Sequence, residues 1–101
     1  MDSDGNFVTK WGSKGSGDRQ FLYADDVVVD PYGYVYISDR HNNRIQKFDS
    51  NGDFITKWGS LGSDDGQFNG PFGVDVDLYG NIYVVDSGIT VSKYLLQPDD
   101  V

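Results

Sequence analysis

The chain has 101 residues and a formal net charge of −8, from 16 acidic and 8 basic side chains. It contains no cysteine, which excludes disulfides, thiolate metal sites and cysteine nucleophiles, and its acidity disfavours binding to phosphate backbones. Aromatic residues make up 15% of the chain, glycine is frequent and proline is rare, which is typical of short strands joined by tight turns. No apolar run is long enough to span a bilayer.

An internal repeat is the most informative feature of the sequence. Residues 2–13 return as residues 49–60, so the offset is 47 residues, and the match continues without a gap to Gln67-Phe68. The match extends on to Asp39 and Asp86 and then shifts by one residue, so that Phe48 pairs with Tyr94, and the second copy has lost the triplet Asn42-Asn43-Arg44. We therefore interpret the chain as a single segment, 1–101, that contains a first repeat, a second repeat and a C-terminal tail, at residues 2–48, 49–95 and 96–101.

The expected secondary structure consists of strands and turns. Residues 7–11 repeat residues 54–58 and are expected to form an outer strand. The loops at residues 12–20 and 59–67 are rich in Gly, Ser and Asp, and Asn51-Gly52 predicts a hairpin turn. Alternation of apolar with polar side chains predicts the remaining strands, at residues 27–30, 34–38, 44–48, 54–58 and 91–95.

A period of 40 to 50 residues with only β-type segments is typical of propeller blades of four strands each. The motifs Gly66-Gln67-Phe68, Gly73-Val74-Asp75-Val76-Asp77, Gly80-Asn81-Ile82-Tyr83-Val84-Val85-Asp86 and, in the first copy, Asn42-Asn43-Arg44-Ile45-Gln46-Lys47-Phe48 resemble the NHL repeat. The resemblance implies an all-β chain of two four-stranded antiparallel β-propeller blades, part of a larger propeller that most often has six blades.

Two blades leave two large aromatic faces without a neighbour, which predicts a partner. The outer strand from Phe7 to Trp11 precedes the first blade, and the second blade is expected to lack its fourth strand. We expect this strand to complete the last blade of a neighbouring copy, so that three chains form a cyclic trimer with six blades. A ring of four chains, an excised or natural fragment of a longer propeller and a constructed or recently amplified propeller unit are open alternatives.

Several acidic residues invite a metal or catalytic interpretation. Residues 2–6 and 49–53 resemble oxygen-rich calcium loops, but Asp-x-Asn-Gly before a strand favours an ordinary turn. Because scaffold groups recur in every copy, four aspartates at strand ends are predicted to cap loops by accepting backbone N–H bonds. No catalytic residue, metal or cofactor is expected. The four aspartates are Asp30, Asp39, Asp77 and Asp86.

The sequence therefore predicts a non-enzymatic, self-assembling scaffold or binding module whose main partner is another copy of itself. A protein or glycan ligand is left open, and neither nucleic acid nor a membrane is expected, although the basic cluster around Arg44 keeps RNA binding as an alternative. A fragment of a propeller enzyme is a further alternative. Trp11 and Trp58 are expected to pack between blades. The candidate ligand-binding residues lie in loops at one end of the propeller and are Tyr23, Asp25, Arg40, His41 and Phe72.

Overall fold

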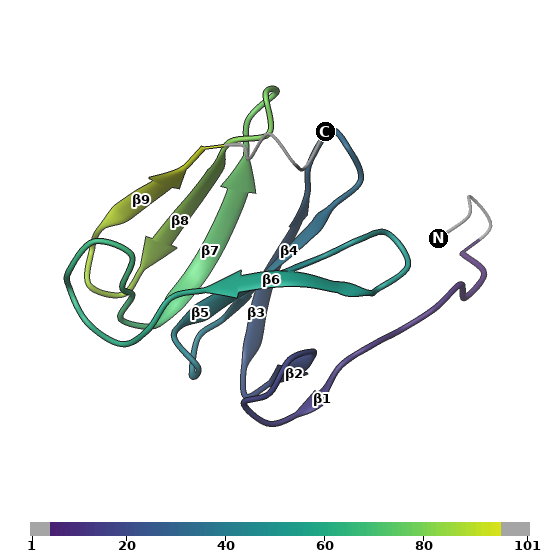
Figure 1. Ribbon diagram of the computed structural model, residues 1–101, viewed down its shortest axis with the longest axis horizontal. Helices are drawn as coiled ribbons and strands as arrows, with labels where there is room; N and C mark the ends of the chain where they lie inside the picture. Colours follow the sequence, from purple (N-terminus) through teal and green to yellow (C-terminus); the bar gives the residue numbers. More distant parts are fainter. Residues whose placement is uncertain (1–4, 96–101) are drawn as a thin grey trace.

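The computed structural model describes residues 5–95 and shows two antiparallel sheets that pack against each other (Figure 1). In each sheet, strands that follow one another in the chain are hydrogen-bonded neighbours. No helix able to cross a membrane occurs among these residues. The first sheet contains β3 (Ala24–Val29), β4 (Val35–Asp39), β5 (Arg44–Phe48) and β6 (Phe54–Trp58). The second contains β7 (Pro71–Val76), β8 (Ile82–Asp86) and β9 (Val91–Tyr94).

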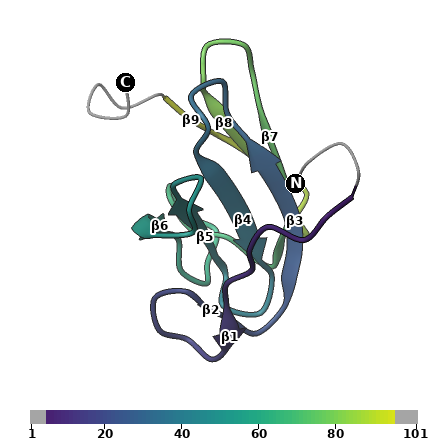
Figure 2. The ribbon, with the colours of Figure 1, turned by 90° about the vertical axis from the view of Figure 1, so that its right-hand side faces the viewer.

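The predicted strands at residues 44–48 and 54–58 are confirmed with the same bounds, as β5 and β6. The inner strand β3 begins at Ala24, three residues earlier than the alternation predicts, because a bulge between Ala24 and Asp26 continues the pairing with β4. The predicted loop at residues 12–20 contains a short parallel pairing between β1 (Ser13–Lys14) and β2 (Gln20–Phe21). This pairing places the loop under the end of the first sheet (Figure 2).

The second sheet has three strands among the described residues, not the four of a complete blade. Residues 7–11 form no strand, although residues 54–58, which repeat them, form β6 on the edge of β5. The segment lies on the opposite side of the two sheets from β9 (Figure 1). The tail at residues 96–101 and the first residues of the first repeat lie outside the described residues.

Strand register confirms the alignment of the two repeats through the one-residue shift. Phe48 pairs with Val35 in the first sheet, and Tyr94 pairs with Ile82 in the second. Counting back along both strands makes Thr90 the equivalent of Arg44 and Ser92 the equivalent of Gln46. The second repeat therefore keeps the strand pairing with a connection one residue shorter, and it carries Thr90 and Ser92 in place of Arg44 and Gln46.

The core lies between the two sheets, where β7 packs across β3 and β4. Trp58 contributes from the outer strand of the first sheet, with its ring centroid 5.2 Å from that of Tyr94 and 6.2 Å from that of Tyr36. This confirms the prediction that Trp58 packs between blades. The buried core residues are Tyr36, Ile45, Phe68, Val74, Ile82 and Val84.

Among the described residues, the outer face of the first sheet is exposed over β3. Val27 is 58% exposed, whereas Val74, its equivalent in the second repeat, is 6% exposed because the first sheet covers it. Trp11 already packs on this outer face at 5.6 Å from Phe48, which parallels the contact of Trp58 with Tyr94. The two repeats thus present the same kind of surface, and only one of them has a neighbouring blade in this chain.

Candidate binding sites

The five candidate residues predicted from the sequence lie together in the structure. Arg40, which follows β4, donates hydrogen bonds from Nε, at 3.0 Å, and from Nη2 to Oδ2 of Asp25. Its guanidinium lies 5.1 Å from the ring centroid of Tyr23 and 5.7 Å from that of Phe72. The ring centroids of Tyr23 and His41 are 4.9 Å apart. We call these five residues the Arg40 cluster.

The Arg40 cluster joins the two sheets, because Phe72 belongs to β7 and the other members belong to the first sheet and its loops. Stacking of a guanidinium on aromatic rings and pairing with a carboxylate both stabilise such a junction. Tyr23 and Phe72 nevertheless keep 46% and 40% of their surface exposed. The cluster therefore offers an aromatic surface to a ligand, while the charge of Arg40 is already compensated by Asp25.

The strand-end aspartates act as loop caps, as predicted. Oδ1 of Asp30 accepts hydrogen bonds from the backbone N–H groups of Tyr32 and Tyr34, at 2.9 and 3.0 Å. Oδ1 of Asp49 likewise accepts bonds from the backbone of Asn51 and Asp53, which confirms the turn interpretation of residues 49–53. Most of residues 2–6 lie outside the described residues.

The hydrogen bonds that Asp77 accepts as a loop cap also lower the pKa of its carboxyl group. Burial by itself would raise the pKa of this carboxyl, but hydrogen bonds from the side chain and backbone of Asn81, the backbone of Tyr79 and the hydroxyl of Tyr83 lower the pKa from its ordinary value of 3.8 to about 2. Burial opposes the charge of Asp86 in the same way, and hydrogen bonds from the groups it caps lower its pKa below the ordinary value. Both carboxylates are therefore charged at neutral pH.

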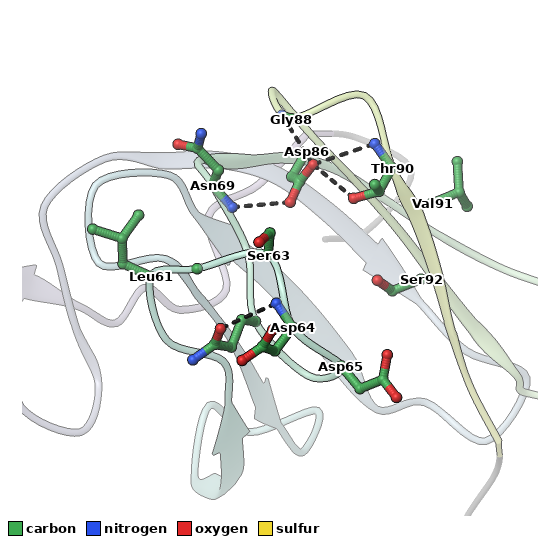
Figure 3. Close-up of a pocket in the computed structure, with 12 residues that line it drawn as sticks. Leu61, Ser63, Asp64, Asp65, Asn69, Asp86, Gly88, Thr90, Val91 and Ser92 are labelled. Carbon is green, nitrogen blue, oxygen red and sulfur yellow. Dashed lines mark hydrogen bonds between the residues drawn. The ribbon is translucent and has the colours of Figure 1, made fainter.

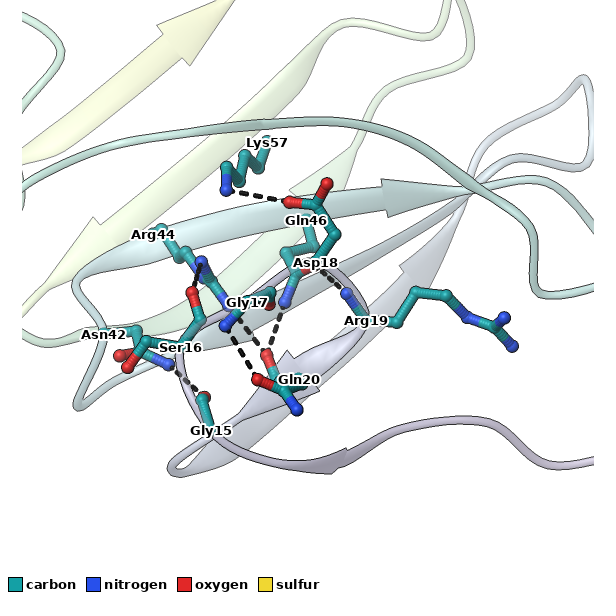
Figure 4. Close-up of polar contacts among 10 residues, drawn as sticks. All are labelled: Gly15, Ser16, Gly17, Asp18, Arg19, Gln20, Asn42, Arg44, Gln46 and Lys57. Carbon is teal, nitrogen blue, oxygen red and sulfur yellow. Dashed lines mark hydrogen bonds and ion pairs between the residues drawn. The ribbon is translucent and has the colours of Figure 1, made fainter.

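A polar clamp in the first repeat holds the loop at residues 15–20 (Figure 4). The buried guanidinium of Arg44 donates to three backbone carbonyl oxygens, those of Ser16, Gly17 and Gln20, each at 2.8 Å. Gln46, also buried, donates to the carbonyl of Gln20 at 2.7 Å. One planar side chain therefore satisfies three carbonyl groups of the loop.

The equivalent loop in the second repeat, residues 62–67, has the same conformation without such a clamp. Gly62 has a φ of 155°, against 151° for Gly15 in the first repeat. Oε1 of Gln67 accepts a bond from the backbone N–H of Asp64 at 3.1 Å, which parallels a bond of 2.9 Å within the loop at residues 15–20. The loop geometry is therefore set by the loop's own glycines and glutamine.

A cavity of about 470 Å³ lies between this second loop and β9 (Figure 3). It occupies the place that corresponds to the polar clamp, because the short side chains of Thr90 and Ser92 stand where the first repeat has Arg44 and Gln46. No basic residue lines the cavity. Its lining residues are Leu61, Gly62, Ser63, Asp64, Asp65, Gln67, Asn69, Asp86, Gly88, Thr90, Val91 and Ser92.

The sequence did not single out these cavity residues as a site. The signal was present in the alignment, because the missing triplet at the start of β9 is the change that opens the cavity. The loop of the second repeat is also more acidic than that of the first, because Asp64 replaces Gly17 and Gly66 replaces Arg19. Comparison of the two copies could therefore have located a cavity with an acidic rim.

Comparisons with known proteins found a family model and solved structures that match part of the chain. The NHL repeat family model matches residues 21–48, which include β3, β4 and β5. A solved structure of streptogramin B lyase is similar over 69% of this chain, with 24% sequence identity and a TM-score of 0.46, and the chain spans 25% of the length of that lyase chain. No curated protein sequence matches the chain. The family match at residues 21–48, the internal repeat and the antiparallel sheets support a relation of this chain to NHL-like β-propellers.

Proposed function

We propose that the chain is a non-enzymatic β-propeller scaffold whose copies assemble by strand exchange, with residues 7–11 of one copy forming the fourth strand on β9 of the next. The observation that carries the proposal is the edge of β9, which has no fourth strand among residues 5–95, although residues 7–11 repeat the sequence of β6. An unpaired edge strand favours pairing with another chain.

The first sheet provides a template for the register of this pairing. In that sheet Ile45 pairs with Trp58, and Gln46 pairs with Lys57. The repeat alignment converts the second pair into Ser92 of one copy opposite Lys10 of the next. The template thus specifies individual partners for the exchanged strand.

An ion pair of the first repeat, transferred by the same alignment, predicts a second contact of the exchanged strand. Nζ of Lys57 on β6 lies 2.8 Å from Oδ1 of Asp18 in the loop of its own blade. The equivalent residues are Lys10 and Asp65, and they belong to the exchanged strand and to the second repeat. An exchanged strand would therefore bring Lys10 of one copy next to Asp65 of another.

The uncovered outer face of the first sheet supports a second copy as the occupant. A groove of about 420 Å³ on this face is lined by Trp11, Val27, Val35 and Ile37 together with neighbouring residues. In the second repeat the equivalent face is covered by the first sheet and forms the core. The second sheet of a neighbouring copy would cover the groove in the same way, and three copies would close six blades.

The absence of catalysis is part of the proposal. The strand-end aspartates serve as backbone caps, and residues 5–95 contain no group of three or more His, Cys, Asp or Glu side chains placed to hold a metal ion. The exposed Tyr23 and Phe72 of the Arg40 cluster favour a ligand surface on the assembled ring. We therefore retain binding of a protein or glycan at this surface as a second role.

The experiment measures the mass of the chain by sedimentation equilibrium, in parallel for the unmodified chain and for Lys10→Glu, Asp65→Lys and the double variant. The unmodified chain is expected to be a trimer. Each single variant should shift assembly to a concentration roughly fivefold higher, the factor that about 1 kcal/mol of lost pairing produces. The double variant should recover assembly, because the charges are again opposite.

The matched control is the double variant Asp18→Lys with Lys57→Glu, which exchanges the equivalent charges within one blade. Its mass should equal that of the unmodified chain, because no contact between copies changes. A folded monomer at all concentrations would contradict the proposal and favour the alternative that the neighbouring blades belong to the same polypeptide.

A further inference from the structure

The cavity of the second repeat corresponds to the space that Arg44 and Gln46 occupy in the first repeat. In the first repeat the equivalent space is filled by the side chain of Arg44, whose three hydrogen bonds of 2.8 Å show what the carbonyl groups of this loop bind. In the second repeat the loop keeps its glycine and glutamine geometry, and the shorter side chains of Thr90 and Ser92 stand where the first repeat has Arg44 and Gln46. We propose that this cavity binds an arginine side chain of a partner protein or peptide.

The second repeat has also changed so as to attract a cation from outside. The carboxylates of Asp64, Asp65 and Asp86 all line the cavity, whereas the first repeat has Gly17 at the position of Asp64. Asp86 is fixed by bonds from the backbone of Asn69 and from Thr90, so its charge faces the cavity from a rigid position (Figure 3). Asp65 and Asp86 have equivalents in Asp18 and Asp39 of the first repeat, so an external arginine meets one additional carboxylate, that of Asp64.

The geometry favours guanidinium over other cations. A guanidinium presents five N–H donors in a planar fork and can reach several carbonyl groups at once, whereas an ammonium is a compact charge on a flexible stem. The three carbonyl groups of the first loop lie where one guanidinium reaches all of them. A single copy forms the whole lining of the cavity, although the proposed assembly would place Lys10 of another copy beside Asp65 at its rim.

The test is a titration of the ¹⁵N-labelled full chain with N-acetyl-arginine amide, followed by amide chemical shifts. N-acetyl-lysine amide, which has the same charge and a different head group, is the matched probe. We expect saturable shifts at residues 62–67 and at Thr90 with the arginine probe, and at least fivefold weaker binding of the lysine probe. Equal binding of the two probes, or the absence of saturable shifts at these residues, would overturn the inference.

A filled-site variant tests the location. Thr90→Arg combined with Ser92→Gln restores the pair that the first repeat carries, and it should abolish binding of the probe and raise the melting temperature. The control is Lys93→Arg, which adds a guanidinium on the neighbouring residue, whose side chain lies over the ring of Tyr83 instead. This control should bind the arginine probe as the unmodified chain does.

A third variant keeps the test informative if the filled-site variant fails to fold. Asp64→Gly recreates the residue of the first repeat, leaves the cavity open and should weaken binding of the arginine probe roughly threefold, as loss of one surface ion pair does. Unchanged binding in this variant would contradict the proposal. A parallel titration with calcium chloride that shifts the same amides at lower concentration would also contradict it, because the cavity would then be a metal site.

Discussion

At the scale of single residues, comparison of the two copies shows a position where the second copy carries backbone strain that the first copy avoids. Asn43 and Ile89 precede the third strand of each sheet, and both have positive φ angles, of 52° and 64°. Asparagine tolerates this left-handed conformation, whereas a β-branched residue is strained in it. Ile89 is 94% exposed, so its side chain gains little from packing.

We expect Ile89→Asn to stabilise the chain by about 1 kcal/mol, because it removes backbone strain at an exposed site. Urea unfolding followed by tryptophan fluorescence measures the effect. The control is Ile55→Asn in the middle of β6, which should not stabilise because its backbone is extended. If Ile89→Asn lowered the stability, strain at this turn would not be the explanation.

The charge of Asp77 makes the stability of the fold depend on pH in the acid range. Its pKa in the folded chain, about 2, lies below its ordinary value of 3.8, so its cap stabilises the fold fully above about pH 4 and loses this effect as the pH falls towards 2. We expect Asp77→Asn to lose most stability relative to the unmodified chain at neutral pH and least near pH 2. Unfolding midpoints in urea between pH 2 and pH 7 test this.

Asp53→Asn, at an exposed turn, is the control for this pH dependence, and its stability should follow that of the unmodified chain across the range. A constant difference between Asp77→Asn and the unmodified chain at every pH would show that the substitution acts through packing instead of charge.

At the scale of strands, the sequence predicted which segments pair but not every boundary. The alternation of side chains at residues 44–48 and 54–58 was sufficient to predict both strand boundaries, because each segment is a regular strand within a meander. The start of β3 was missed because Ala24, Asp25 and Asp26 do not alternate, and the pairing there depends on a bulge against β4. The parallel pairing of Ser13 with Gln20 was missed because it joins two ends of one loop.

Strand exchange makes a register-specific prediction, and the chain has no native cysteine to interfere. Lys10→Cys combined with Ser92→Cys should give an interchain disulfide on mild oxidation, since the template pairs Gln46 with Lys57. Non-reducing electrophoresis measures the cross-linked fraction. Lys10→Cys combined with Val91→Cys is out of register and on the other face, and should cross-link much less.

Comparable cross-linking of the two cysteine pairs would show that residues 7–11 contact β9 without a fixed register. Cross-links confined to one chain would contradict exchange between copies.

At the scale of the whole molecule, the two sheets show why a propeller blade needs neighbours on both sides. Val74 is covered and Val27 is exposed although both stand at the same position of the repeat. The burial of a residue is therefore decided by whether a neighbouring blade is present, and apolar area left uncovered in this way favours association. Trp11 already occupies its place on the free face, where a second copy would complete the packing.

The two candidate sites differ in how far the sequence predicted them. The Arg40 cluster was predictable because its members flank equivalent loops at one end of the repeat, and the fold brings such loops together. The only sequence signal for the cavity of the second repeat was the arginine that is missing from the second copy, because no side-chain motif marks the backbone carbonyl groups of the loop.

The sequence by itself determined the repeat, the positions of most strands and the aspartate-capped turns, because these depend on local periodicity and on hydrogen bonds between residues close in the chain. Only the tertiary structure decided which face of each sheet is covered, that β9 is the last of three strands in the second sheet among residues 5–95, and that a cavity lies beside the loop at residues 62–67. Those features depend on contacts between segments far apart in the chain, and the sequence of either segment alone does not contain them.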